Sequence, residues 1–234
     1  MQIPTVLSLE EQAYLSALLT QPHRHYHNIT HINDCLVELY KMLQANVANV
    51  YEPELTYAIW YHDAIYNPYA LTGVNEEQSA QLYTDYQVHY GKSSKFIHDE
   101  VAYAIRATAF HINTQQFEDA KSEQEIDIAT FMLDIDLSGL GKYKPIVAFN
   151  SLNIAKEYPQ THPIDFIQGR FKFFTALNKR ESFYYTDYFK SLYDERAKAN
   201  VAYELRVLQD AIDNNNPAIY FDEMRECAEE LTVW

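Results

Sequence analysis

The chain has 234 residues, of which 47% are apolar and 15% are aromatic, so it is long enough to bury a sizeable core within one large domain. Its formal net charge of −15 disfavours a nucleic-acid polymer as partner, because an acidic surface repels phosphates. The two cysteines, Cys35 and Cys227, make no disulfide framework. With no signal-peptide pattern and no apolar run approaching the ~20 residues of a membrane helix, we expect a cytoplasmic protein without membrane association.

Apolar residues recur at helical spacing along the chain, and no segment reads convincingly as a strand. A capping box that begins at Ser8 predicts a first helix up to about Thr20. The second helix is predicted over 25–47, with an apolar stripe at three- and four-residue steps. His27, His31 and Cys35 lie along the edge of that stripe, where a core would meet a cleft.

Three further helices are predicted in the first half. One begins near Pro53 and carries His62 within its apolar stripe, at a position where an apolar residue would normally lie. Asn75 is the expected N-cap of a helix over 76–90. The next helix runs from about Lys95 to His111, and His111 extends its apolar face.

A second capping box, beginning at Ser122, opens a helix that carries two aspartates. At 100° per residue, Asp136 lies on the apolar face of this helix and Asp134 on the opposite face. A carboxylate on a buried face should be paired with a base or should bind a metal. Asp136 is therefore the preferred candidate, with Asp134 as the alternative.

The remaining third reads as four helices. The fold class predicted is an all-α bundle, treated as a single domain over 1–234 with a core at about 20–160 and additional C-terminal helices at about 163–234. Aromatic residues are frequent in the C-terminal helices, which could cover a homodimer surface. The four helices are expected over 143–158, 163–179, 184–213 and 218–231.

Several of these residues have the chemistry of a divalent metal site. His27 and His31 are four residues apart, which on a helix is ~6 Å of rise and nearly one face. His62-Asp63 and Asp136 add two more polar groups on apolar faces. Imidazole nitrogens and carboxylate oxygens both bind such ions. Solvated histidines, a core histidine bonded to a carbonyl and an ordinary salt bridge are the alternatives for the three groups taken singly.

In this order the residues resemble the HD superfamily of metal-dependent phosphohydrolases, and in particular a poorly characterised bacterial family of predicted HD phosphohydrolases. The segment Tyr-His-Asn-x-x-His at 26–31 is also similar to a motif of cyclic-nucleotide phosphodiesterases. The resemblance covers most of the chain and implies an HD-domain-like helical bundle. The stretches that carry it are 24–32, 60–63, 75–80, 133–137, 140–141, 157–158 and 195–200.

The resemblance implies that four residues hold a divalent metal: His31, His62, Asp63 and Asp136. The ion, which could be Mn, Co, Ni, Fe, Mg or Zn, would activate a bound water for attack on phosphorus. His27 would protonate the leaving oxygen, a task suited to a group with an unperturbed pKa of about 6.5. The expected activity is hydrolysis of a small phosphate ester, most simply a nucleotide.

Other residues are candidates for a supporting role at the site. Some HD proteins use two further histidines for a second metal, and His111 together with His98 or His89 could supply them. The resemblance gives Glu76 a role in orienting the metal-bound water, although a carboxylate in a first helical turn needs no other reason. Arg24 could steady a phosphate or could be a solvated surface arginine. A di-iron oxygenase on the same scaffold and a non-catalytic metal- or nucleotide-binding sensor are the rival functions.

Overall fold

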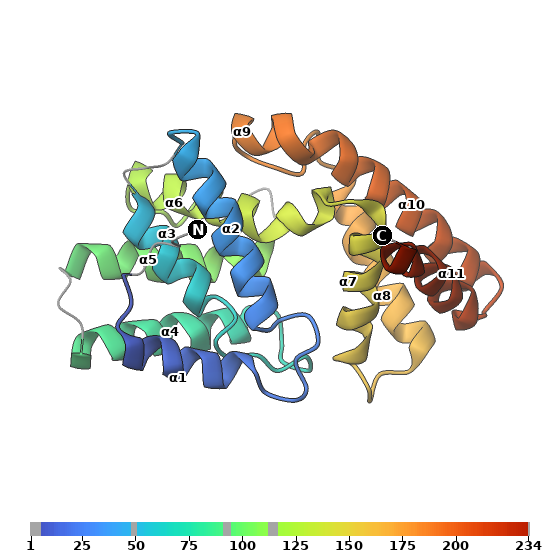
Figure 1. Ribbon diagram of the computed structural model, residues 1–234, viewed down its shortest axis with the longest axis horizontal. Coiled ribbons are helices and arrows are strands. Elements are labelled where there is room, and N and C mark those ends of the chain that lie inside the picture. The colour runs from blue at the N-terminus through green and yellow to red at the C-terminus, as the bar shows by residue number, and fades with distance from the viewer. Residues whose placement is uncertain (1–5, 48–50, 91–94, 112–116, 234) are drawn as a thin grey trace. The chain divides into compact units, whose positions relative to one another are not determined.

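The computed structural model describes residues 6–47, 51–90, 95–111 and 117–233, and among these the side chains of 95–98 and 232–233 are not described. Every regular element in the described residues is helical, which confirms the all-α prediction (Figure 1). None of the helices described combines the length and the apolar character needed to cross a membrane. The chain divides into two compact units, Met1–Asp136 and Leu137–Trp234.

The first unit holds the candidate site residues. The capping box at Ser8 is confirmed, because the Ser8 hydroxyl accepts a hydrogen bond from the Glu11 amide at 3.1 Å. The Ser122 hydroxyl accepts likewise from the Glu125 amide at 3.1 Å. The helices of this unit are α1 (Leu9–Leu19), α2 (Ile29–Gln44), α3 (Glu52–Tyr61), α4 (Val74–Tyr90), α5 (Lys95–Ala107), the 3-10 turn η2 (Thr108–Phe110) and α6 (Glu123–Leu137).

The central helix of the first unit is α3, which packs against α2, α4 and α5 (Figure 1). Its residues are therefore buried on almost every face: Glu54, Leu55, Thr56, Tyr57, Ala58, Ile59 and Tyr61. Pro53 lies at its first turn, as the sequence predicts, where a missing amide hydrogen costs nothing. Residues at the C-terminal end of α3 are consequently directed into the interior of the unit.

Two helix starts differ from the prediction. The N-cap of α2 is Asn28, so the helix begins at Ile29 and His27 precedes it. The helix α4 begins at Val74, so Asn75 is not its cap. The Asn75 amide instead holds the preceding loop, accepting from the Asn67 amide and donating to the Asn67 carbonyl, both at 3.0 Å.

The second unit contains the C-terminal helices. The predicted long helix over 184–213 begins only at Asp187, because Thr186 is its N-cap. It then passes through a π-helical turn before α10. The helix α7, which the sequence placed with the core at about 20–160, belongs to this second unit. The elements are η3 (Ser138–Gly141), α7 (Lys144–Lys156), α8 (Pro163–Leu177), α9 (Asp187–Phe189), η4 (Lys190–Asp194), α10 (Glu195–Asp213), α11 (Pro217–Glu229) and η5 (Glu230–Val233).

A buried charge network joins the helices of the second unit. Glu204 of α10 is 2% exposed and accepts from the Arg170 guanidinium of α8 at 2.7 Å. The Tyr220 hydroxyl of α11 donates to the same carboxylate at 2.7 Å, and the Ser151 hydroxyl of α7 donates at 2.9 Å. Because the charges are opposite and hydrogen-bonded, their burial is tolerated. One carboxylate thus contacts side chains from three other helices.

In the first unit, Glu11 is a carboxyl group buried within the helical packing. It is 4% exposed and accepts hydrogen bonds from the Tyr61 hydroxyl at 2.7 Å and the Gln87 amide at 3.0 Å. Burial raises its pKa above the ordinary value of 4.5, and these hydrogen bonds offset the rise only in part. The folded protein therefore binds more protons here than the unfolded chain between 4.5 and the raised pKa, so stability falls as pH rises through that window.

We expect Glu11→Gln to remove this pH dependence. Relative to the unchanged protein, the variant should gain unfolding free energy as pH rises from below 4.5 to neutrality, measured by urea unfolding across that range. Glu10→Gln, at the exposed neighbouring position, is the matched control and should follow the unchanged protein. A Glu11→Gln variant that loses stability relative to the unchanged protein as pH rises would contradict a raised pKa for Glu11.

Candidate metal centre

His31 lies in the first turn of α2, and the start of that helix is held by a side-chain cap. The Asn28 side-chain oxygen Oδ1 accepts a hydrogen bond from the Thr30 amide at 2.8 Å. His31 is 7% exposed and shares the inward face of the helix with apolar residues. The buried apolar residues of α2 are Ile32, Cys35, Leu36, Leu39 and Met42. The amphipathic helix therefore directs the imidazole into the unit.

His62 and Asp63 follow the last turn of α3. The His62 Nδ1 atom lies 2.8 Å from the Ile59 carbonyl oxygen, and His62 is 2% exposed. Because a carbonyl only accepts, Nδ1 carries the hydrogen, and a neutral His62 has its lone pair on Nε2. A backbone contact of this kind fixes the tautomer and the orientation of a metal-binding histidine.

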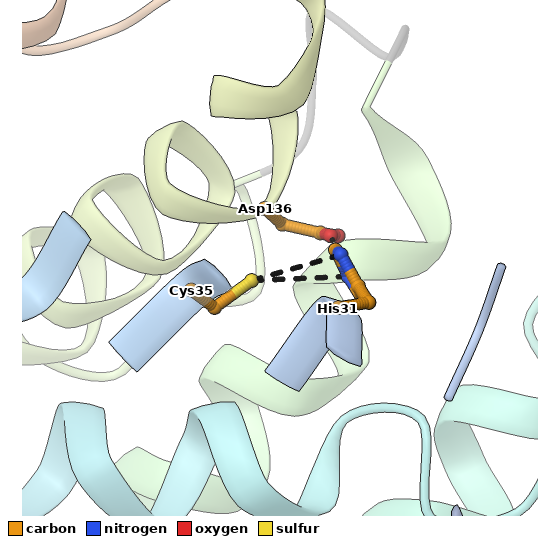
Figure 2. Close-up of side chains that lie close together, drawn as sticks. All are labelled: His31, Cys35 and Asp136. Atoms are coloured by element: carbon orange, nitrogen blue, oxygen red, sulfur yellow. Dashed lines mark hydrogen bonds and ion pairs between the residues drawn. The ribbon is translucent and has the colours of Figure 1, made fainter. Parts of the chain in front are cut away.

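Asp136 reaches the same place from α6. Its Oδ1 atom lies 2.9 Å from His31 Nε2, and its Oδ2 atom lies 2.9 Å from His111 Nε2. Figure 2 shows the Asp136 carboxylate and the His31 ring directed toward each other. Three segments far apart in sequence thus bring imidazole and carboxylate groups together.

The separations between these atoms fit a shared cation. His31 Nε2 and His62 Nε2 are 3.3 Å apart. Asp63 Oδ2 lies 3.2 Å from His62 Nε2 and 3.7 Å from His31 Nε2, and Asp136 Oδ1 lies 3.7 Å from His62 Nε2. Two ligands at about 2.0–2.2 Å from one ion lie about 3 to 3.5 Å apart for right-angled or tetrahedral geometry. The residues present could therefore hold a divalent metal.

The electrostatics favour a cation at this place. Burial alone would raise the pKa of the Asp63 and Asp136 carboxyls, but the neighbouring His62 and the other imidazoles outweigh it and lower both pKa values. For His62, burial would lower the pKa, and the two carboxylates raise it instead. Two carboxylates are thus ionised in a largely buried site, where a divalent ion would neutralise them.

One atom of the cluster lacks a hydrogen-bond donor. Asp63 Oδ2 is buried and forms no hydrogen bond with the described residues, although two imidazole nitrogens lie within 3.7 Å of it. A buried carboxylate oxygen without a donor is costly, and a metal ion directed at its lone pair would remove that cost. The unsatisfied Asp63 Oδ2 atom is the strongest single observation that these residues fit a metal ion.

His27 is positioned differently from the prediction. It is not on a helix with His31, because Asn28 caps α2 and leaves His27 in the turn before it. The His27 ring stacks on Tyr66, with centroids 4.3 Å apart, and its centroid lies 6.3 Å from that of His31. His27 therefore still lies beside the centre, and Tyr66 is a neighbour that no periodicity in the sequence identifies.

Arg24 is neither a surface arginine nor free to hold a phosphate through its whole guanidinium. It is 6% exposed, and its Nη1 atom donates to the His27 carbonyl at 3.0 Å and to the Asp63 carbonyl at 2.6 Å. Its Nη2 atom donates to the Ala64 carbonyl at 2.8 Å. Arg24 thus joins the turn that carries His27 to the turn that carries Asp63.

Glu76 lies in the first turn of α4 and is half-buried. Burial raises its pKa above 4.5, with a further rise from Asp63 and Asp136 and an opposing effect from His111. Those interactions place Glu76 within electrostatic reach of the centre. A carboxyl with a raised pKa can exchange a proton closer to neutral pH than an ordinary one.

The histidines considered for a second metal lie at different places in the structure. His111 follows η2 and contacts Asp136, so it lines the centre. The His98 side chain lies outside the described residues. His89, the other histidine considered for this role, is exposed on α4, where its Nδ1 atom lies 2.8 Å from the Asp85 carbonyl oxygen.

Two residues near the centre differ from the sequence-based picture. Asp134 does not face solvent but is fully buried, because the second half of α6 is buried on most faces. Among the described residues it belongs to neither group of potential metal ligands, whereas Asp136 belongs to one of them. Cys35, which the sequence placed only on the edge of the apolar stripe, belongs to the same group as Asp136 and His31. Its four-residue spacing from His31 was the available signal.

Comparison with protein-family models, with curated proteins and with solved structures finds no match to this chain.

The Arg24 contacts predict a loss of both stability and metal affinity in Arg24→Met. Hydrogen bonds to a charged donor contribute about 1.5–3 kcal/mol each, so we expect a loss of at least about 2 kcal/mol in unfolding free energy. Disorder of the His27 and Asp63 turns should also weaken metal binding about 10- to 100-fold, as measured by titration calorimetry with Mn²⁺ or Zn²⁺.

The matched control is Arg106→Met in the same unit. Arg106 pairs with Glu77 at 2.6 Å on the exposed surface, where ion pairs contribute about 0–1 kcal/mol. This variant should bind metal as the unchanged protein does. Equal metal affinity in Arg24→Met and Arg106→Met would show that Arg24 does not position the centre.

Proposed function

We propose that this protein is a metal-dependent phosphohydrolase that cleaves a small phosphate ester. The observation that supports this most is the convergence of His31, His62, Asp63 and Asp136, which arrive from three separate segments with separations of 2.9–3.7 Å between their nitrogen and oxygen atoms. The ordered His…His-Asp…Asp set resembles the HD superfamily, and the geometry is the one that such a set would need. The nucleotide class of substrate rests on the similarity of 26–31 to the phosphodiesterase motif.

A divalent ion bound by these four residues would withdraw charge from the phosphoryl group and strengthen water as a nucleophile at neutral pH. In the proposed reaction, water adds to phosphorus, the ester oxygen departs as an alcohol and inorganic phosphate or a phosphomonoester is released. The protein must therefore accept one proton from water and deliver one to the leaving oxygen.

His27 is the proposed proton donor to the leaving oxygen. Its ring lies beside His31 and stacks on Tyr66, and His27 belongs to neither group of potential metal ligands in the described residues. A histidine that is close to the centre but not used for metal binding is suited to general-acid catalysis. The Arg24 bridge between the two turns would keep His27 at a fixed distance from Asp63.

Glu76 is the proposed acceptor of the proton that water gives up. It is half-buried, and its raised pKa reflects burial together with the nearby Asp63 and Asp136 charges. Such a carboxylate can orient a water molecule by accepting its hydrogen bond and can then take the proton.

His111 supports one rival function. Its contact with Asp136 Oδ2 at 2.9 Å adds another imidazole to the cluster, as a di-iron oxygenase of the same architecture would require. Two irons per chain and consumption of dioxygen would favour that enzyme over a hydrolase. A non-catalytic sensor is the second rival, and it would be stabilised by metal and nucleotide without releasing product.

We expect His62→Ala and Asp63→Asn to lose the metal and all turnover. Metal content per chain, measured by inductively coupled plasma mass spectrometry after loading with Mn²⁺, Co²⁺ or Ni²⁺, should fall to background in both variants. His89→Ala, which alters an exposed histidine of the same unit, is the control and should retain the metal. Full metal content in Asp63→Asn would contradict the proposed ligand set.

His27→Ala should keep the metal and lose general-acid catalysis. Hydrolysis of an alkyl phosphate should slow by about 100-fold or more, whereas a nitrophenyl phosphate, which needs no proton on its leaving group, should be cleaved at nearly the original rate. Phosphate release from a panel of esters in the presence of the loaded metal measures both. If both substrates slow equally, or if the variant loses its metal, His27 is not the proton donor.

A further inference from the structure

Cys35 lies beside the proposed centre, and the proposed reaction gives it no role. Its Sγ atom is 3.8 Å from His31 Nε2 and 3.9 Å from His31 Nδ1, and the residue is 2% exposed. Figure 2 shows the sulfur directed toward His31 and Asp136. One ligand-type atom from each of these three residues lies within 4.8 Å of the other two.

The position of the sulfur follows from α2. Residues four apart on a helix lie on one face, so His31 and Cys35 are presented together to the interior. A buried cysteine usually serves as a small apolar residue that packs against hydrocarbon. Here the sulfur instead faces the His31 imidazole.

We propose that Cys35 is a thiolate ligand of the metal centre, which makes the centre a mixed nitrogen, oxygen and sulfur site selective for Zn²⁺ or Co²⁺ over Mg²⁺ and Mn²⁺. This inference rests on the metal centre of the proposed function. Thiolates favour softer ions, whereas Mg²⁺ and Mn²⁺ favour sites built from oxygen. On binding, the sulfur lone pair forms the bond to the cation and the thiol proton is released to solvent, so no oxidant or reductant is needed.

A sulfur ligand would also determine which ion supports activity. A site with only His31, His62 and two carboxylates accepts several first-row ions. A sulfur ligand beside Asp136 makes the site more selective, because a thiolate contributes little to the binding of a hard cation. The hydrolase should then be most active with an ion that tolerates sulfur.

Cobalt spectroscopy tests the inference without measuring activity. The metal-free protein is titrated with Co²⁺, and we expect visible d–d bands together with a near-ultraviolet sulfur-to-cobalt charge-transfer band. The chain has only two cysteines, so Cys227→Ser leaves Cys35 as its single thiol and is the matched control. That variant should keep the charge-transfer band, and Cys35→Ser should lose it while keeping the d–d bands.

We also expect Cys35→Ser to change the preference of the site for Zn²⁺ over Mn²⁺. In competition titrations, the ratio of Zn²⁺ to Mn²⁺ affinity should fall about tenfold or more in Cys35→Ser and stay unchanged in Cys227→Ser. Bound Co²⁺ with d–d bands but no charge-transfer band in the unchanged protein or in Cys227→Ser would overturn the inference and leave the metal centre intact. Failure of the unchanged protein to bind Co²⁺ at all would overturn the centre itself. In Cys227→Ser the only thiol left is Cys35, so the presence or absence of the charge-transfer band in that variant decides whether Cys35 is a ligand. The test therefore stands even if Cys35→Ser does not fold.

Discussion

The interaction on which the first unit depends is the contact of the Asp136 carboxylate with two imidazoles. One oxygen meets His31 of α2 and the other meets His111 beyond α5, so a single side chain joins three segments separated by up to 105 residues in sequence. An ionised carboxylate in a largely buried position is stable only when opposite charge or hydrogen bonds compensate it. The second carboxylate at Asp63 doubles that demand. A buried excess of negative charge surrounded by imidazole nitrogens is the physical reason to expect a cation.

Around this cluster, hydrogen bonds between side chains and the backbone hold the site residues in place. The Ile59 carbonyl fixes the His62 tautomer, and the Asn28 side chain fixes the start of the helix that carries His31. Arg24 holds the turns of His27 and Asp63 through their carbonyl oxygens. None of these contacts changes the charge of the centre, but each limits how far its members can move. Preorganisation of this kind is what catalysis by proton transfer and charge stabilisation requires.

The sequence predicted the elements better than their ends. The apolar period of α6 favoured Asp136 over Asp134, and the structure brings Asp136 against His31 and His111. The same period placed Asp134 on the opposite, solvent-facing side, whereas the structure buries it fully, because contacts from outside a helix are not visible in its own sequence. The prediction that His27 lies on the helix was wrong, because Asn28 is the N-cap and the helix begins only at Ile29. An asparagine within a periodic stretch is easily read as part of the helix. The role of Arg24 could not be predicted, since its carbonyl partners belong to turns whose approach depends on tertiary packing. The division of the chain into compact units after Asp136 likewise depends on packing between helices.

The most direct test of the metal centre is a crystal structure of the metal-loaded protein, with anomalous scattering recorded at the absorption edge of the loaded ion. We expect an anomalous peak bounded by His31 Nε2, His62 Nε2 and oxygens of Asp63 and Asp136, with each of these atoms at about 2.0–2.2 Å from the ion. A loaded crystal with no peak at that position, or with the ion held elsewhere in the chain, would contradict the central claim.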